Sequence, residues 1–187
     1  NFYICTMNAT REEIIRIADE LIRSKGYHAF SYADISKVLG VKNAAIHYYF
    51  PSKSDLGVAV IDNTAEKFQQ TIRSWEQLPY ETQFQHFVTM HQKTQKNEWV
   101  CLMGALSPTY DTLSESMQLQ LKELADNIII WLTGLLENGR AKGVFHFTEE
   151  AKAKAYCIQS SLLASLLLNK VLKNDVYQVI QNTILTV

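Results

Sequence analysis

Four side chains that can donate hydrogen bonds lie close together between residues 42 and 48 of the chain. Lys42, Asn43, His47 and Tyr48 carry ammonium, amide, imidazole and phenol groups, and proteins use such groups to contact the phosphates and base edges of DNA. Ala44 among them is small enough for close approach, and its methyl group can meet a thymine methyl. Because aromatic residues alone are equally well explained as packing residues, the prediction depends on the elements that would position this group.

The surrounding residues predict two short helices joined by a tight turn. Ser31 and Asp34 have the spacing of a capping box, Gly40 permits a left-handed helix end, and Pro51 disfavours helix in the residue before it. The apolar positions expected to face inward are Ile35, Val38, Leu39, Val41, Ala45, Ile46 and Phe50. This arrangement is that of a helix-turn-helix, which lays its second helix in the major groove.

The stretch resembles the TetR family of transcriptional repressors. The matching positions are Ser31, Ile35-Ser36, Gly40-Val41-Lys42, Ile46-His47-Tyr48-Tyr49-Phe50 and Ser52-Lys53. The sequence departs from the family pattern at Lys42, where serine is usual, and at His47, where tyrosine is usual. Serine would cap the second helix, so either Asn43 caps it here or the helix begins less sharply.

The resemblance implies an all-α chain in which an N-terminal three-helix helix-turn-helix head sits on a helical ligand-binding and dimerisation domain. We expect the head to span residues 8–54 and the body residues 55–187. The residues expected to contact DNA are Ser31, Tyr32, Lys42, Asn43, Ala44, His47, Tyr48, Tyr49 and Lys53.

Helical spacing of apolar residues continues along the chain, and no segment has a convincing strand pattern. Thr10 and Glu13 favour a capped first helix. The ranges predicted to be helical outside the head motif are 10–25, 52–75, 81–96, 101–108, 114–141, 148–172 and 175–185.

The family resemblance implies a ligand cavity among the middle helices. The residues that could line it are His91, Trp99, Cys101, Met103, Tyr110, Met117, Trp131 and Phe145. Each of them is equally well explained as ordinary helix core. Cys101 begins a short apolar helix, where a helix N-terminus can lower a thiol pKa, so a redox or electrophile sensor acting through Cys101 is an alternative function.

The last two predicted helices carry more apolar residues than one small monomer readily hides. We expect Tyr156, Leu163, Leu167, Val176 and Ile180 to lie in a homodimer interface. A two-fold dimer would place two recognition helices about 34 to 36 Å apart or somewhat more, which suits a palindrome.

Composition limits the other functions. The 187 residues have a net charge of −1, and residues 8–55 hold seven Lys and Arg against six Asp and Glu, so a positive surface must arise from placement. Cys5, Cys101 and Cys157 contain no CxxC pair, which argues against a disulfide framework or a zinc site and for a reducing cytoplasm. We expect no cofactor, and no membrane partner because no apolar run reaches ~18 residues.

The sequence therefore predicts a one-component DNA-binding regulator. We expect a repressor that a small apolar or aromatic ligand releases from a palindromic operator. An enzyme is not expected, because catalytic motifs are absent and the five histidines are scattered. A helical interaction module that keeps the head as a scaffold is a further alternative, and the near-neutral charge of the head is the observation that favours it.

Overall fold

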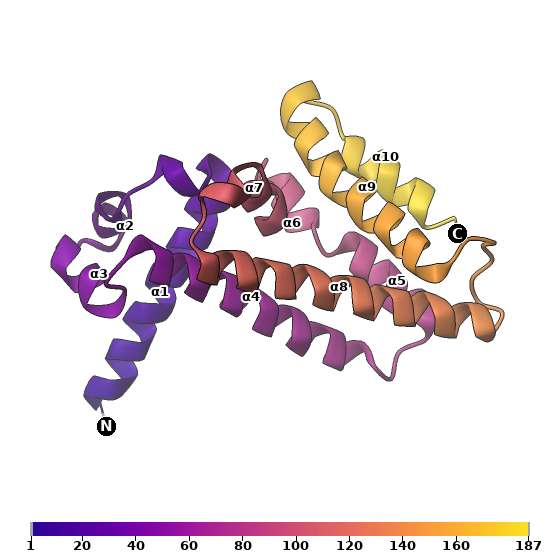
Figure 1. The fold of residues 1–187 in the computed structure, drawn as a ribbon, viewed down its shortest axis with the longest axis horizontal. Coiled ribbons are helices and arrows are strands. Elements are labelled where there is room, and N and C mark those ends of the chain that lie inside the picture. Colours follow the sequence, from indigo (N-terminus) through magenta and orange to yellow (C-terminus); the bar gives the residue numbers. More distant parts are fainter. Residues whose placement is uncertain (1, 187) are drawn as a thin grey trace.

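Helices make up the fold of the described chain. The computed structural model describes residues 2–186, among which no strand is present, and the predicted all-helical class is confirmed (Figure 1). At one end lie α1 (Phe2–Lys25), α2 (Tyr32–Leu39) and α3 (Asn43–Tyr49), with the short 3-10 turn η1 (Tyr27–Ala29) after α1. The first helix begins at Phe2, so the expected start at residue 10 is wrong.

Two long helices connect this end to the body. α4 (Lys53–Trp75) and α8 (Glu115–Ala141) run side by side along the molecule (Figure 1). Ser52 caps α4 in a capping box with Asp55, and Ser114 caps α8 by accepting a hydrogen bond from the Met117 amide. The long helices therefore begin where polar capping residues satisfy their first amide groups.

Shorter elements connect α4 to α8 along the chain. They are α5 (Tyr80–Thr89), α6 (Gln92–Lys96), α7 (Leu102–Leu106) and the 3-10 segment η2 (Ser107–Thr112). A single helix was expected over 81–96, but the chain breaks at Met90 and His91. The Met90 amide bonds the carbonyl of Phe87, and His91 has φ −91° and ψ 7°, so the last turn tightens and the helix ends.

The C-terminal pair is α9 (Ala151–Leu172) and α10 (Val176–Ile184), which pack on each other, with α9 also lying against α8 (Figure 1). By length and composition alone, α9 could cross a membrane, since an 18-residue window has mean hydropathy 1.3. The expectation concerned an uninterrupted apolar run, and polar residues such as Gln159, Ser160 and Ser161 interrupt α9. Only 33% of that window is buried, so much of the apolar surface of α9 is uncovered in one chain.

Two apolar clusters form the core, and they do not divide at residue 54. The first joins α1, α2 and α3 to Leu56, Val60 and Ile61 of α4 and to buried residues of α7 and α8. The second fills the body around Phe68 and Leu132. Because the first half of α4 belongs with the head, packing continues across the boundary that the sequence pattern suggested.

Candidate functional site

The turn between α2 and α3 has the predicted local geometry. The Ser31 amide donates to the Asp34 carboxylate at 2.7 Å, and the capping box is complete. Gly40 has φ +67°, and its amide donates to the carbonyl of Ser36. The prediction of a capped helix, a left-handed glycine and a second short helix is confirmed.

Tyr32 holds α3 against the head instead of pointing outward. Its side chain is buried, its hydroxyl donates to the carbonyl of Phe50 at 2.9 Å, and its ring meets His47 edge to face at 4.6 Å. Burial, with a smaller effect of Asp55, raises the pKa of Tyr32 to about 12. Its hydroxyl is used internally, so the side chain of Tyr32 supports α3, and the DNA contact expected of Tyr32 stays a prediction.

The first residue of α3 is bonded to α2. Asn43 Oδ1 accepts a hydrogen bond from the Ser36 hydroxyl at 2.6 Å, while Lys42 occupies the N-cap position without a side-chain cap. Asn43 therefore does not cap the helix, and of the two possibilities left open by the sequence, the uncapped start is the one observed. Because Ser36 holds Oδ1, the side-chain amide of Asn43 is fixed, and its Nδ2 group remains as a hydrogen-bond donor.

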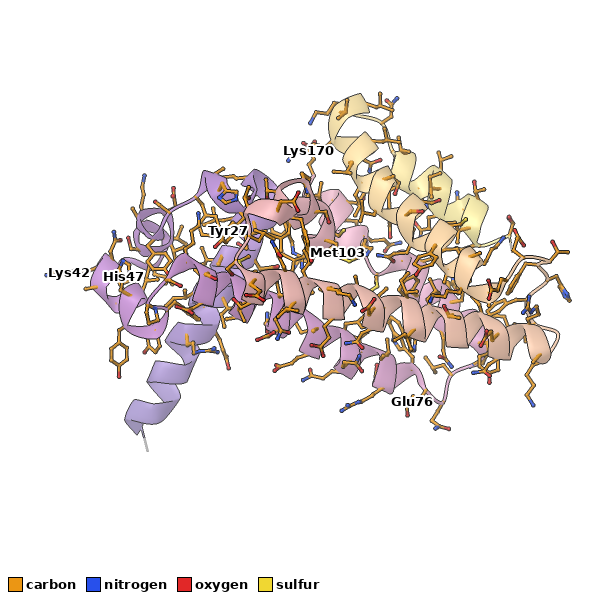
Figure 2. The ribbon with its side chains drawn as sticks, viewed as in Figure 1. Tyr27, Lys42, His47, Glu76, Met103 and Lys170 are labelled. Atoms are coloured by element: carbon orange, nitrogen blue, oxygen red, sulfur yellow. The ribbon has the colours of Figure 1, made fainter. Side chains whose placement is uncertain are left out.

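A polar surface remains exposed on α3, which we call the recognition face. It consists of Lys42, Asn43, Ala44, His47 and Tyr48. Figure 2 shows Lys42 and His47 at the end of the molecule farthest from α9 and α10. Tyr48 is 70% exposed, and the ring of half-buried Tyr49 supports it edge to face at 5.2 Å. The structure thus brings five predicted residues together on one exposed surface.

Lys53 is turned inward. Its Nζ donates to the carbonyl of Phe30 and lies 4.2 Å from the centroid of the Phe30 ring and 4.9 Å from that of Tyr27. Burial lowers its pKa. Without DNA, Lys53 therefore makes an internal cation–π and hydrogen-bond contact, and the phosphate contact expected of it stays a prediction. Ser31 is exposed, but its hydroxyl donates to Asp34.

Three further residues of the head are exposed, although Lys37 was overlooked in the sequence and Val38 and Val41 were expected to face inward. Lys37 is exposed on α2, and Val38 and Val41 are 65% and 37% exposed. The expectation that both valines pack inward is wrong, because Ile35, Tyr32 and Ile46 already fill the small core below them. The lysine was detectable as an isolated base on a short helix, whereas the exposure of the valines depends on packing.

A cavity of about 500 Å³ lies in the body. Four residues expected in such a cavity line it, namely His91, Trp99, Cys101 and Met103, the last labelled near the centre of Figure 2. Helices α1, α4, α7, α8 and α9 all contribute to the wall. The cavity therefore touches both the first helix of the head and the helices of the body.

The other four expected cavity residues lie elsewhere. Tyr110 is 36% exposed on η2, and Met117 is buried against Gly57, where an added Cβ would lie 2.6 Å from its sulfur. Trp131 packs behind Phe68 and Phe87. Phe145 packs on Phe84. These four residues serve as ordinary core or surface groups, which corrects their expected position in the wall.

Charges along the cavity are mostly paired. Arg23 Nε donates to Asp19 at 2.8 Å, and Arg16 pairs with Glu20 at 2.7 Å. Burial, reinforced by Arg23, lowers the pKa of His91 to about 4, so its imidazole is neutral at pH 7. The cavity therefore presents a neutral ring and two internally paired arginines, together with the lysines Lys67 and Lys93.

Cys101 is a protonated thiol at neutral pH. It is 5% exposed, and burial raises its pKa despite the amide of Gly104, which donates to Sγ at 3.4 Å. A lowered pKa was only one possibility for this helix start, and the structure agrees with the other, a buried core cysteine, because desolvation outweighs the helix amides. Cys101 and Cys157 are both free, and the side chain of Cys5 lies outside the described residues.

The deepest lining residues were not anticipated. They are Phe68, Phe87, Leu102, Leu124 and Gln159, all buried. The four apolar residues looked like core in the sequence, and only the convergence of five helices, α4, α5, α7, α8 and α9, distinguishes the set. Within the described part of the chain, no three His, Cys, Asp or Glu side chains meet in a way that could hold a metal ion.

The outer surface of the last two helices is apolar. Tyr156 and Leu167 are 53% and 39% exposed, whereas Leu163, Val176 and Ile180 are only partly buried. Further large apolar residues are exposed beside them, namely Leu168, Val171, Leu172 and Val179. We call the exposed residues of this surface the α9–α10 face.

Comparison with known proteins agrees with this arrangement. The family described as bacterial regulatory proteins, tetR family, matches residues 14–60. A TetR transcriptional regulator from Legionella pneumophila is 32% identical, with 94% of this chain and 95% of that chain covered and a TM-score of 0.82. A TetR family regulator from Agrobacterium tumefaciens is 26% identical, with coverages of 96% and 97% and a TM-score of 0.90.

A curated relative has a named role. The HTH-type transcriptional repressor NemR of Escherichia coli is 24% identical over 173 residues, covering 89% of this chain and 86% of the relative. The helix-turn-helix with its exposed recognition face, the family match over the head and the similarity along almost the whole chain agree with one another. The chain belongs to the TetR family and is a DNA-binding transcriptional regulator.

Proposed function

We propose that this regulator is a repressor that binds a palindromic operator as a homodimer and is released by a small ligand in the body cavity. The observation that carries the proposal is the recognition face, where Lys42, Asn43 and His47 are exposed on a helix that buried contacts hold in place. Its E. coli relative NemR, which is a named repressor, supports the direction of regulation.

The α9–α10 face supports a homodimer. A monomer would leave Val171 77% exposed and Val179 63% exposed beside the half-exposed Tyr156, and exposed apolar surface of this kind marks interaction sites. Ser160 and Ala164 are small exposed residues on the same helix and allow two α9 helices to approach closely. A second copy of the chain is the occupant proposed here, because a two-fold pair also supplies two recognition faces.

The wall of the cavity suggests how ligand binding reaches the head. Arg16 and Arg23 of α1 line the cavity together with α4 residues. Further along the same junction, the Val100 amide donates to the carbonyl of Arg23 at 3.3 Å. A ligand that enters must displace or tighten these contacts. Because α1 and α4 also pack in the head, a change in their contacts reaches the recognition face.

Other contacts across the junction fix the position of the head. Ser54 and Ser114 share a hydrogen bond at 2.5 Å, and His28 and Thr112 share one at 2.9 Å. Lys170, labelled in Figure 2, donates to the carbonyl of Ser24 at 3.1 Å. Release from DNA requires the ligand to favour the DNA-incompetent arrangement of these contacts by about 1 to 3 kcal/mol.

The test is selection of binding sites from random duplex DNA, followed by titration of the selected duplex at two salt concentrations. The proposal predicts that a palindrome is selected and that the affinity falls steeply with salt. Basic side chains that contact the phosphates release counterions from the DNA, and added salt opposes this release. Lys42→Ala should weaken binding, and Lys142→Ala, at the far end of α8, should not. If the protein is folded and dimeric but selects no sequence, the proposal is contradicted and a helical interaction module is favoured.

A sensor acting through Cys101 is a second candidate. Cys101 lines the cavity, and a fold neighbour is E. coli NemR in a form described as reduced. Because burial raises the Cys101 pKa, a modifying reagent must enter the cavity and meet a thiol. Cys101→Ser should abolish release of DNA by oxidants or quinones, while Cys157→Ser, at the exposed cysteine of α9, should leave it intact; an unchanged response in Cys101→Ser rejects the candidate.

A further inference from the structure

The wall of the cavity holds more positive than negative charge. Its bases are Arg16, Arg23, Lys67 and Lys93, and its acids are Asp19 and Glu20. Each of the two acids is paired with one of the arginines. Because the imidazole of His91 is neutral at pH 7, four bases less two acids leave a net charge of +2. This surplus belongs to the two lysines.

The two lysines lie on different helices and have different surroundings. Lys67 of α4 and Lys93 of α6 are both exposed, and neither forms an ion pair with a residue in the described part of the chain. Lys67 also borders a second hollow between α1 and α4, whose wall contains the acids Glu12, Glu13, Asp55, Asp62 and Glu66 with the arginines Arg11 and Arg16. These acids offset part of the Lys67 charge.

Fewer acids surround Lys93. Helix α6 contains none, and the two acids beside it have other partners. Asp175 accepts a hydrogen bond from Gln95 at 3.3 Å, and Glu98 pairs with Lys173 at 2.9 Å. The ammonium group of Lys93 is therefore the less neutralised of the two in the cavity wall.

Trp99 adds a third donor to the same wall. Its backbone amide donates to the carbonyl of Thr94 at 3.0 Å, which places Trp99 directly after the helix that carries Lys93. Ammonium and indole N–H groups donate hydrogen bonds and accept none. A carboxylate accepts only and carries the opposite charge, so it matches these groups in both respects.

The rest of the wall is largely apolar. Phe68, Phe87 and Leu124 line the cavity and are buried. Trp131 packs behind both phenylalanine rings, with its centroid 6.0 Å from that of Phe68 and 5.3 Å from that of Phe87, so the rings are held in place. The cavity thus combines exposed cationic residues with a buried apolar surface, which is the pattern that an amphipathic anion requires.

We propose that the cavity receives an amphipathic monocarboxylate, whose apolar body lies among Phe68, Phe87 and Leu124 and whose carboxylate binds Lys93, with a smaller contribution from Lys67. The inference rests on the proposed function, in which the cavity receives the releasing ligand, and gives the chemical class of that ligand. Because both lysines are exposed, the carboxylate keeps part of its hydration, and binding avoids the cost of fully burying a charge.

The experiment compares two probes of nearly equal shape on the full-length protein at pH 7. 4-Propylbenzoate is an anion, and 4-propylbenzamide is its neutral counterpart. At about 50 mM salt, isothermal titration should give a dissociation constant roughly tenfold lower for the benzoate. At about 1 M salt the preference should fall to roughly twofold, because interactions between exposed charges are screened.

Three substitutions by methionine, which keep an apolar stem and remove the charge, locate the effect. At low salt, Lys93→Met should reduce the preference to about twofold, Lys67→Met should reduce it less, and the double variant should show roughly equal affinities. Lys96→Met is the matched control, because Lys96 is exposed on the same helix but does not line the cavity. It should change the preference by less than about twofold.

Binding of the benzamide shows in every variant whether the apolar part of the cavity is intact. If the wild-type protein binds both probes equally, or the double variant keeps the tenfold preference, the carboxylate class is overturned and the cavity remains a ligand site. If neither probe binds at millimolar concentration, the inference is overturned together with the cavity as a site for small amphipathic ligands. Selection of an operator tests the DNA-binding part of the proposed function independently of both results.

Discussion

In the head, the hydrogen bonds that position α2 and α3 join residues within one short stretch of the chain, whereas the body cavity gathers residues from most of the chain. Ser31 and Asp34 are 3 positions apart, and Tyr32 and Phe50 are 18 apart. The cavity wall, by contrast, combines Arg16 of α1 with Gln159 of α9. The DNA-contacting surface is thus specified locally, and the cavity depends on how distant helices meet.

The largest expected effect tests the head. Ile35 is fully buried in α2, whereas Val38, three residues later, is 65% exposed. Ile35→Ala should lower the free energy of unfolding by about 2 to 5 kcal/mol, and Val38→Ala should change it by less than about 0.5 kcal/mol. Chemical denaturation of both variants measures the difference; equal losses would mean that Val38 packs inward as its spacing suggested.

A second effect concerns protonation in the body. The pKa of His91 is lowered to about 4 by burial and Arg23, below the unfolded value of about 6.5. The folded state therefore binds fewer protons between about pH 6.5 and pH 4. The free energy of unfolding should fall as pH falls through that window, by roughly 3 kcal/mol at most.

The measurement for His91 is a series of denaturation curves from pH 7 to pH 4.5. His91→Gln should flatten the dependence that the wild-type protein shows over this range. His146→Gln removes an exposed histidine and should leave the dependence in place. A wild-type curve that does not change between pH 6.5 and pH 4.5 would contradict the assignment.

Packing in α8 gives a smaller effect. A Cβ added at Gly139 would lie 2.3 Å from two ring carbons of Phe145, whereas one added at Gly134 would meet nothing within 4 Å. Gly139→Ala should lower the free energy of unfolding by about 1 to 3 kcal/mol through overpacking. Gly134→Ala should raise it by up to about 1 kcal/mol through helix propensity. Thermal unfolding of both variants tests the pair.

The smallest effect isolates one hydrogen bond of the head. Tyr32→Phe removes the hydroxyl that donates to the Phe50 carbonyl. The loss should be about 1 kcal/mol, with little change in the fold because the ring remains. A variant as stable as the wild-type protein would mean that the hydroxyl does not hold the end of α3.

Much of the head could be predicted from sequence because caps and turns are local. The capping box at Ser31, the left-handed Gly40 and the exposure of Lys42 follow from residue types and short spacings. Tyr32 and Lys53 could not be placed, since each bonds a backbone carbonyl, of Phe50 and of Phe30, that only the folded head presents.

The body was less predictable for the same reason. Apart from the start of α1 and the break at His91, the helix ranges were recovered approximately, because apolar periodicity records them. Cavity residues were only half recovered. Met117 and Trp131 have the same residue types as true lining residues but pack elsewhere. Gln159 has no sequence signal, since it joins the wall of a cavity that six other helices complete.

The most direct test of the central claim is titration of the selected operator duplex and of single-base variants with the wild-type protein, Asn43→Ala and Lys142→Ala. The account predicts that Asn43→Ala loses about 1 to 3 kcal/mol of discrimination at the base pairs it contacts. Lys142→Ala should bind like the wild-type protein. Undiminished discrimination in Asn43→Ala, together with the same result for Lys42→Ala and His47→Ala, would contradict the assignment of α3 as the element that reads DNA.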